Sequence, residues 1–392
     1  MPLSAQTMQF IKEHWLDDVH TLALQVGKYP EVNLPEAVVQ IAGRQSVEEK
    51  IPSWYTTEGI RYPRRLSLEQ CSSEATALYK ASLIKGESLA DVTGGWGVDC
   101  TFLSVNFRKV VYVERQKELC ELTAHNFSLL GLNHIAIENA DAVSYVKKMQ
   151  AVDCIYLDSA RRDMHGKKLI RLADCEPDIS ELEDLLLTKA SKVMVKLSPM
   201  LDLSQALCSL PHTEEIHIVS VCNECKELLL ILGNHTGKDI PIHCVNITGD
   251  KRDLFVFTRE EERNAACTYT GKLETFLYEP NASVLKAGAF RSIACSYGIR
   301  KLHPNSHLYT SNTLIEDFPG RRFLITGSCS FRKREMKELL SGLEKAHITV
   351  RNFPATVEEL RKRIKLHDGG GAYLFATTLA GESKALIRCE KP

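Results

Sequence analysis

The chain has 392 residues, of which 44% are hydrophobic and 25% are charged, and this length predicts two or three domains with a substantial core. The composition excludes collagen, a coiled coil and a disordered tail protein. The formal net charge of −1 hides an uneven distribution, because residues 281–392 contain 19 Lys and Arg against 10 Asp and Glu. The rest of the chain is therefore acidic, and the asymmetry indicates that one end meets an anionic partner.

The sequence has no feature of a membrane or secreted protein. No stretch approaches the roughly 18 consecutive apolar residues of a membrane span, and the N-terminus lacks the basic run and apolar block of a secretory signal. The 13 cysteines, an odd number without regular spacing, favour a reducing, cytoplasmic setting. The one CxxC pair, Cys222 and Cys225, lacks the second pair that a tetrahedral zinc site usually has, so no metal site is predicted.

The first two-thirds of the chain predict a helical region followed by an α/β domain. Residues 1–65 have helical spacing of apolar residues and are divided by prolines. A helix is predicted over 67–85, and strands are predicted over 88–93, 109–114, 134–139, 152–158 and 192–198. Helices between them are predicted near 98–106, 116–131, 142–149 and 180–190. This alternation within residues 66–262 indicates a Rossmann-like parallel sheet with helices on both faces.

After residue 198 the alternation is expected to stop. Strands predicted over 214–221 and 227–233 are too close in the chain for a crossover helix, so they should form an antiparallel hairpin. Two further short strands are predicted over 243–248 and 254–258. Residues 263–320 are interpreted as a linker and a small domain. Residues 321–392 are interpreted as a compact α+β domain with strands over 323–328, 348–353 and 372–379 and helices over 332–345 and 356–364.

A glycine-rich turn, Asp91-Val92-Thr93-Gly94-Gly95-Trp96-Gly97, follows the first predicted strand. The dinucleotide motif G-x-G-x-x-G does not fit well, because its third glycine falls on Cys100. The spacing from Asp91 to Gly95 and Gly97 resembles the [DE]-x-x-x-G-x-G loop of S-adenosylmethionine (SAM) methyltransferases. That resemblance implies a cofactor site in which Asp91 holds the methionine amino group and the glycines, with Thr93 and Gly94, leave room for the adenosyl part. The alternative is a surface turn.

Acidic residues also follow the second and third predicted strands. Glu114 can accept hydrogen bonds from both ribose hydroxyls, a device that NAD enzymes share. Asp141 and Ala142 follow the third strand, and in SAM methyltransferases an acidic residue there contacts the adenine amino group. An Asp at the same place can also cap the next helix, and both interpretations can hold together.

The fourth predicted strand ends in Asp158-Ser159-Ala160-Arg161-Arg162. Ligands of open α/β sheets bind at the carboxyl ends of the strands, so this loop should face the glycine-rich turn. Amino-methylating enzymes carry [DNS]-P-P-[YFW] here, and Asp158 keeps the acceptor while the prolines and the aromatic residue are replaced. We expect Asp158, Ser159 and Arg161 to be catalytic, although the arginines could instead bind an anion or form surface ion pairs. Lys196, at the end of the fifth strand, either lines the pocket or pairs with an acid.

The chain resembles a bacterial group of class I SAM-dependent methyltransferases with ferredoxin-like and THUMP-like domains at the C-terminus. The stretches that carry this resemblance include LEQCSSEATALYKASL (68–83), LADVTGGWGVD (89–99), YLDSARRD (156–163), VKLSPMLDL (195–203), ECKELLL (224–230) and YEPNASVLKAGAF (278–290). Near the C-terminus, VRNFPATVEELRKRIKLHDGG and AYLFATTL also match. The resemblance implies a THUMP-like domain over 321–392 and, because THUMP domains generally help enzymes to hold RNA, an RNA substrate.

The charge of the C-terminal region supports an RNA partner on separate grounds. Residues 321–366 contain 12 Lys and Arg against 5 Asp and Glu, and phosphate contacts supply most sequence-independent affinity for nucleic acid. The clusters are Arg332, Lys333, Arg334, Arg361, Lys362 and Arg363, and the alternative is a solvated helix surface. Three other functions stay open: an NAD(P) oxidoreductase, an inactive RNA-binding protein, and a methyltransferase of proteins or small molecules. The antiparallel hairpin favours a methyltransferase over the first.

Overall fold

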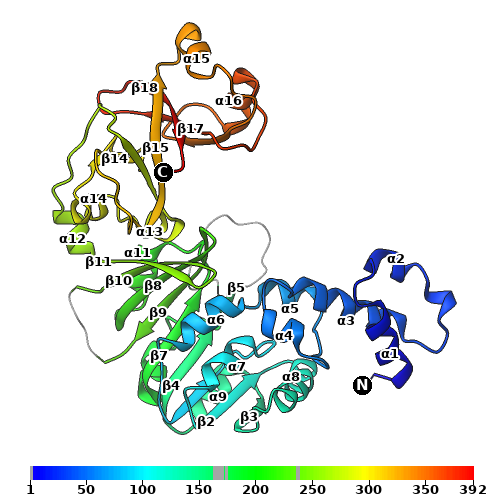
Figure 1. The fold of residues 1–392 in the computed structure, drawn as a ribbon. Coiled ribbons are helices and arrows are strands. Elements are labelled where there is room, and N and C mark those ends of the chain that lie inside the picture. The colour runs from blue at the N-terminus through cyan, green and yellow to red at the C-terminus, as the bar shows by residue number, and fades with distance from the viewer. Residues whose placement is uncertain (1–2, 162–171, 173–174, 235–238) are drawn as a thin grey trace. The chain divides into compact units, whose positions relative to one another are not determined.

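The structure is a computed structural model that describes residues 3–161, 172, 175–234 and 239–392. The chain divides into two compact units, and Figure 1 shows the elements of each. Unit 1 comprises residues 1–214 and 228–236, and unit 2 comprises residues 215–227 and 237–392. Within the described part of the chain, no helix is long and apolar enough to cross a membrane.

Unit 1 begins with short helices, as the sequence predicts. They are α1 (Ala5–His14), α2 (Val19–Ala23), the 3₁₀ helix η1 (Val26–Lys28), α3 (Leu34–Ser46), α4 (Pro52–Thr56) and α5 (Arg65–Gln70). Ser4, Asp18 and Asn33 cap α1, α2 and α3, each accepting a hydrogen bond from a backbone amide in the first turn. The apolar faces of α1, α2 and α3 meet around Phe10 and Ile41 in a small core, so these helices are held by packing as well as by capping.

The centre of unit 1 is a parallel sheet, which confirms the predicted fold class. Its parallel strands are β1 (Ser88–Asp91), β2 (Lys109–Glu114), β3 (Ile135–Asn139), β4 (Val152–Asp158) and β7 (Ala190–Leu197), paired in the order β3-β2-β1-β4-β7. The helices packed with it are α6 (Glu74–Ala81), α7 (Val98–Ser104), α8 (Lys117–Leu129), α9 (Ala142–Lys148) and α10 (Glu183–Lys189) (Figure 1). The core includes Leu89, Leu103, Tyr112 and Tyr156. A two-stranded ladder, β5 (Ala160–Arg161) with β6 (Cys175–Glu176), follows β4.

One predicted helix is divided in the structure. The sequence predicts a single helix over 67–85, whereas α5 ends at Gln70 and α6 begins at Glu74. Cys71 has an extended backbone, and the Ser73 hydroxyl accepts a hydrogen bond from the Thr76 amide as an N-cap. Serine competes for backbone hydrogen bonds and therefore favours caps over helix interiors. The division matters because Ser72, between the two helices, belongs to a buried polar network beneath the candidate site.

The predicted hairpin is present, and an additional helix precedes it. Helix α11 (Leu203–Ser209), which was not predicted, lies between β7 and β8 (Thr213–Val221), and β8 continues into β9 (Glu224–Leu232). Cys222 and Asn223 both have positive φ angles, 49° and 64°, as a two-residue hairpin turn requires. Residues 228–232 of β9 pair antiparallel with β7. An antiparallel strand therefore follows the parallel ladder, as expected.

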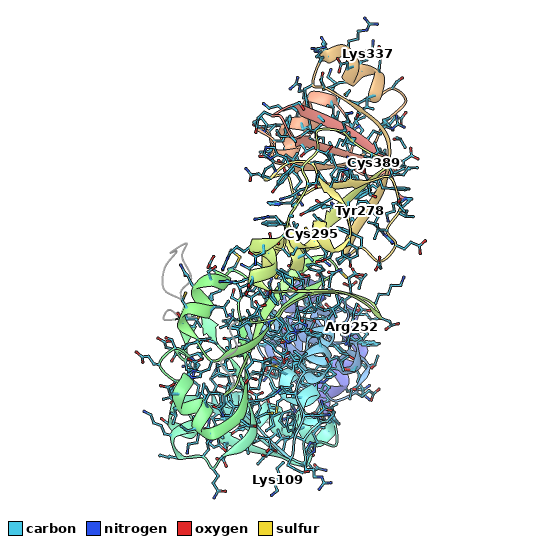
Figure 2. All side chains as sticks on the ribbon, turned by 90° about the vertical axis from the view of Figure 1, so that its left-hand side faces the viewer. Lys109, Arg252, Tyr278, Cys295, Lys337 and Cys389 are labelled. Carbon is cyan, nitrogen blue, oxygen red and sulfur yellow. The ribbon has the colours of Figure 1, made fainter. Side chains whose placement is uncertain are left out.

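Unit 2 contains β10 (Ile242–Thr248), which pairs parallel with β8 and antiparallel with β11 (Lys251–Phe257). After α12 (Arg259–Asn264), a second sheet has the order β13-β14-β12-β15-β18-β17-β16. Its strands are β12 (Phe276–Pro280), β13 (Arg300–Lys301), β14 (Tyr309–Ser311), β15 (Gly320–Cys329), β16 (His347–Arg351), β17 (Tyr373–Thr378) and β18 (Lys384–Glu390). Figure 2 labels Tyr278 of β12 and Cys389 of β18, both fully buried.

The helices of this second sheet differ in part from the prediction. They are α13 (Ala282–Ala287), α14 (Ser292–Ser296), α15 (Lys333–Leu339) and α16 (Val357–Ile364). The helix predicted over 332–345 ends early, since Gly342 has a φ of 77°, which a right-handed helix cannot continue through. Helix α16 agrees with its predicted range and begins with a capping box of Thr356 and Glu359. Strands β12 and β18 were not predicted from the sequence.

Candidate functional site

The glycine-rich turn connects β1 to α7, and its backbone requires glycine. Gly95 and Gly97 have φ angles of 56° and 82°, a region that other residues rarely adopt. A Cβ at Gly97 would lie 2.7 Å from a Thr123 methyl group, and one at Gly94 would lie 2.0 Å from the Tyr112 ring. A Cβ at Gly95 would instead meet nothing closer than 4.0 Å. The turn is thus packed against the protein at Gly94 and Gly97 and has open space at Gly95.

Asp91, at the end of β1, is a buried carboxylate with an unused acceptor. The residue is 1% exposed, and its Oδ1 accepts a hydrogen bond of 3.1 Å from the Thr93 amide. Oδ2 is buried and has no hydrogen-bond partner within the described residues. Burial raises the pKa of Asp91 well above its ordinary value, and the nearby carboxylates of Asp99, Asp158 and Glu114 raise it further. A cationic hydrogen-bond donor at Oδ2 would offset both the burial of the carboxylate and the repulsion from its neighbours.

Glu114 and Asp141 lie at the ends of the next two strands along the sheet edge. Glu114 is 9% exposed, and its two oxygens accept hydrogen bonds from the amides of Gly95 (3.0 Å) and Gln116 (2.8 Å). Each oxygen keeps a second lone pair, so the residue holds the glycine turn without losing its capacity for a ligand hydroxyl. Asp141 caps α9 by accepting from the Ser144 amide at 3.0 Å, while Ala142 is the first residue of that helix. The cap is therefore present, and the adenine contact stays a prediction.

Asp158 ends β4 and forms an ion pair with Lys196 of β7. The register of the two parallel strands places these residues side by side, and Lys196 Nζ lies 2.5 Å from Asp158 Oδ2. The Asp158 amide donates to the Thr93 hydroxyl at 2.6 Å, which ties β4 to the glycine-rich turn. Of the two interpretations of Lys196, the ion pair is the one that the structure shows. Asp158 keeps 32% of its side chain exposed, so its carboxylate remains accessible.

Ser159 and Arg161, the other two predicted catalytic residues, follow Asp158 directly. Ser159 is buried, and its hydroxyl donates to the Pro177 carbonyl at 3.0 Å. Arg161 lies in β5, where its backbone pairs with Cys175, but its side chain falls outside the described part of the structure, as does Arg162 as a whole. The catalytic roles of Ser159 and Arg161 therefore stay predictions.

A buried polar network beneath the site was not predicted from the sequence. Lys80 of α6 is fully buried, and its Nζ lies 3.1 Å from Asp99 Oδ1 and 2.9 Å from the Ser72 hydroxyl. Asp99 Oδ2 accepts hydrogen bonds from Ser72 (2.8 Å) and Tyr156 (2.7 Å). Burial opposes ionisation of Asp99, but Lys80 and Lys196, with these two hydroxyls, lower its pKa below the ordinary value. The one sign of this network in the sequence is Lys80 itself, a lysine among the apolar residues of the predicted helix over 67–85.

The sheet brings the predicted cofactor residues together. Asp91 pairs with Tyr112 and Tyr156 in the neighbouring strands, so Glu114 and Asp158 each lie two residues beyond it at the same edge. The carboxyl ends of parallel strands are the usual binding edge of an open α/β sheet. This edge combines a turn with open space at Gly95 and a buried acceptor at Asp91.

Comparison with solved structures identifies the family. The chain is 35% identical to a protein from Porphyromonas gingivalis W83 that was crystallised as a candidate methyltransferase, with a TM-score of 0.89. The match covers 98% of this chain and 97% of that one. The chain therefore belongs to the same family as this Porphyromonas gingivalis protein. Family profiles add a ferredoxin-like domain over residues 276–319 and a THUMP-like domain over residues 320–391, which confirms the resemblance drawn from the sequence.

Other solved structures match a smaller part of the chain. A candidate methyltransferase from Streptococcus mutans in complex with SAH is 13% identical, with a TM-score of 0.31, and the match covers 41% of this chain and 95% of that one. An rRNA methylase from Streptococcus thermophilus is 12% identical, also with a TM-score of 0.31, over 41% of this chain and 96% of that one. No curated protein gives a significant match.

The THUMP-like domain of this family member carries its basic residues in two different settings. Arg321 and Arg351 bind the buried carboxylate of Glu279, so these two cations stabilise the domain. Arg332, Arg334 and Arg361 pair with acidic side chains of their own or adjacent segments, namely Glu335, Glu338 and Asp368. Within the described residues, five exposed cations on and beside α15 and α16 take part in no ion pair: Lys333, Lys337, Lys362, Arg363 and Lys365. The cationic surface is thus smaller than the sequence count indicates.

Proposed function

We propose that this protein is a SAM-dependent methyltransferase that acts on RNA. The observation that carries the proposal is the Oδ2 atom of Asp91, which has no partner among the described residues and is buried beside a glycine-rich turn with open space at Gly95. A buried acceptor without a partner costs about 1–3 kcal/mol, and it is a feature of functional sites when a specific ligand supplies the missing donor. The family to which the chain belongs supports the proposal.

The residues present fit SAM. The ammonium group of its methionine part would donate to Asp91 and offset the repulsion from the neighbouring carboxylates. Glu114 would accept hydrogen bonds from the ribose hydroxyls through the lone pairs that its bonds to backbone amides leave free, and Asp141 would contact the adenine amino group. When bound, SAM supplies an electrophilic methyl group on a sulfonium centre.

Asp158 would orient the acceptor atom. Its exposed carboxylate can accept a hydrogen bond from a target amine and so aim the nitrogen lone pair, which is catalysis by positioning. Lys196 supports this role, because its ammonium group pairs with the carboxylate at 2.5 Å and restricts the rotation of the Asp158 side chain. The Thr93 hydroxyl, bound to the Asp158 amide, couples this orientation to the cofactor turn.

RNA is the proposed substrate because of the THUMP-like domain and the exposed cations of α15 and α16. Phosphate contacts of Lys and Arg give affinity that depends little on sequence, and a substrate-holding domain needs affinity of that kind. Among the described cations on and beside α15 and α16, the five without ion pairs are available for such contacts, whereas Arg321 and Arg351 are already bound to Glu279.

Two experiments test the proposal. Thermal unfolding with SAM, SAH or NAD should show stabilisation by the first two and none by NAD, because ligand binding to the folded state raises the unfolding midpoint. Methyl-tritiated SAM should then be incubated with the protein and either total RNA or total protein. Label in RNA supports the proposal, and label only in protein assigns a protein methyltransferase. SAM binding without transfer to either pool contradicts the proposal and favours an inactive RNA-binding protein or a small-molecule methyltransferase.

A further inference from the structure

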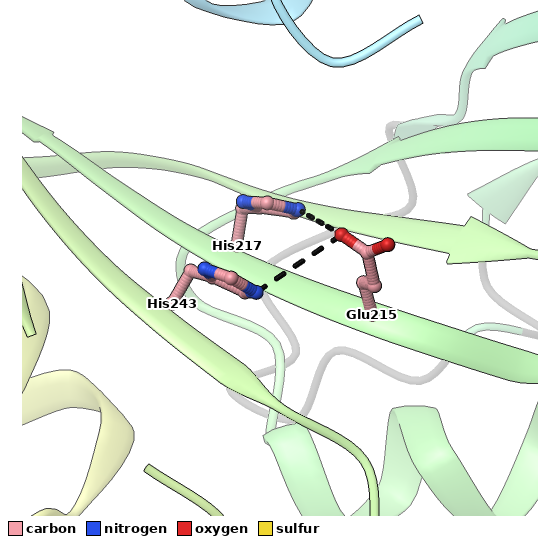
Figure 3. Close-up of side chains that lie close together, drawn as sticks. All are labelled: Glu215, His217 and His243. Carbon is pink, nitrogen blue, oxygen red and sulfur yellow. Dashed lines mark hydrogen bonds and ion pairs between the residues drawn. The ribbon is translucent and has the colours of Figure 1, made fainter. Parts of the chain in front are cut away.

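Three side chains of unit 2 that the proposed function does not use converge at one point. They are Glu215, His217 and His243, which we call the Glu-His-His cluster (Figure 3). His217 Nε2 lies 3.3 Å from Glu215 Oε2, and His243 Nε2 lies 4.0 Å from the same oxygen. One ligand atom from each residue lies within 4.8 Å of the others. Among the described residues, this is the one group of three or more His, Cys, Asp or Glu with such an arrangement.

The strand register produces this convergence. Glu215 and His217 are two residues apart on β8, and a strand places such residues on the same face. His243 pairs directly with His217 across the parallel β8–β10 ladder, and the two rings lie 4.4 Å apart with an interplanar angle of 15°. The arrangement therefore rests on regular backbone on both sides, which is more rigid than a site built on loops.

The distances suit a small divalent cation. Bonds of about 2.0–2.1 Å from Zn²⁺ to histidine nitrogen and carboxylate oxygen give a tetrahedral edge of about 3.4 Å. The His217–Glu215 distance of 3.3 Å already matches that edge. The His243–Glu215 distance of 4.0 Å needs a small closure and a rotation of one ring, since parallel rings do not aim both nitrogens at one ion. His243 and Glu215 are the two more exposed members of the cluster, with 24% and 40% of their side chains accessible. Their side chains therefore have room for this movement.

The surroundings also suit a metal. On the neighbouring strand β11, Val256 pairs with His243 and is 43% exposed. Solvent therefore reaches the sheet beside His243, which provides an entry path for a metal ion and room for a water ligand.

We propose that the Glu-His-His cluster binds a divalent transition metal through two histidine nitrogens and one carboxylate oxygen, with water as the fourth ligand. Imidazole and carboxylate donors in this number match zinc sites that keep an open position. The simpler interpretation is a hydrogen bond between Glu215 and His217 with His243 stacked beside it, and no metal. A metal site binds added Zn²⁺ through these three residues, whereas a cluster that is only hydrogen-bonded does not.

The test uses the full chain after treatment with a chelator and titration with Zn²⁺ by calorimetry. We expect Zn²⁺ to bind at one site that Glu215→Gln and His243→Gln each weaken about tenfold or more, since even a partner in the outer shell contributes that much. His20→Gln, at an exposed histidine of α2, is the matched control and should bind like the natural chain. Unfolding without metal, compared among the variants, shows that each is folded.

Cysteine ligands are the main source of a false result, because Cys222 and Cys225 form a CxxC pair nearby in the chain. Replacing Zn²⁺ by Co²⁺ distinguishes the Glu-His-His cluster from a cysteine site. A site of nitrogen and oxygen ligands gives visible d–d bands without thiolate charge-transfer bands. Retention of the site in Cys222→Ser/Cys225→Ser supports the proposal. It is overturned if the natural chain binds no Zn²⁺, if Glu215→Gln and His243→Gln bind as the natural chain does, or if the Co²⁺ spectrum shows thiolate ligands.

Discussion

The substitution Asp91→Asn tests the central feature of the candidate site, because it should change stability and cofactor binding in opposite directions. The amide has nearly the shape of the carboxylate, so packing at the end of β1 is kept and only the charge is removed. In the free protein, that charge is buried, has no partner at Oδ2 among the described residues and faces three other carboxylates. Asp91→Asn should therefore make the free protein more stable.

The magnitudes follow from the charge and the hydrogen bond involved. Removing a desolvated charge that faces three other carboxylates should stabilise the free chain by about 1–2 kcal/mol. The same change removes a charge-assisted bond to the SAM ammonium, which is worth about 1.5–3 kcal/mol. Affinity for SAM should therefore fall by about ten- to a hundredfold. A residue with only a structural role would not produce this combination.

The stability difference between Asp91→Asn and the natural chain should also depend on pH. The pKa of Asp91 is higher in the folded chain than its ordinary value of 3.8, so the folded state keeps the proton to a higher pH than the unfolded state does. Below pH 3.8 both states are protonated and Asp91 carries no penalty. As pH rises from there through the raised pKa, the natural chain loses stability relative to the variant.

The assay compares unfolding midpoints across this pH range and measures SAM affinity by calorimetry. Asp250→Asn, at an exposed aspartate in the turn between β10 and β11, is the matched control and should change neither quantity. The proposed role of Asp91 is refuted if Asp91→Asn lowers the stability of the free protein, or if SAM binds the variant as tightly as it binds the natural chain.

Three further predictions concern Asp158, the buried network beneath the site, and the cations of the THUMP-like domain. Asp158→Ala should leave SAM affinity within about twofold and abolish methyl transfer, because the carboxylate orients the acceptor and not the cofactor; unchanged transfer would remove Asp158 from the mechanism. Lys80→Met should cost about 3–5 kcal/mol in chemical denaturation, since it leaves Asp99 buried without its cation, whereas Lys12→Met at an exposed pair should change little. Lys337→Glu with Lys362→Glu should weaken RNA binding and lower the slope of log K against log salt by about 0.7 for each phosphate that the domain no longer neutralises; an unaltered slope would place the RNA elsewhere.

Much of the fold was predictable because its signals are local. The ranges predicted for β2 and β4 agree with the structure, since buried central strands are continuous apolar runs bounded by polar residues. Strand β18 was not predicted, and the helix predicted over 67–85 is divided. In both cases distant residues decide the outcome: β18 is held between β15 and β17, and the Ser72 hydroxyl donates to Asp99.

For the candidate site, the sequence alone determined which residues stand at the strand ends and where the backbone needs glycine. These are properties of neighbouring residues, so the spacing from Asp91 to Gly97 was sufficient. Only the tertiary structure decided the partners of these residues: Lys196 for Asp158, Lys80 for Asp99, and His243 for His217. Such pairs depend on the register of strands and on the packing of helices that are far apart in the chain, 38 residues in the case of Lys196 and Asp158, and no local pattern encodes that register.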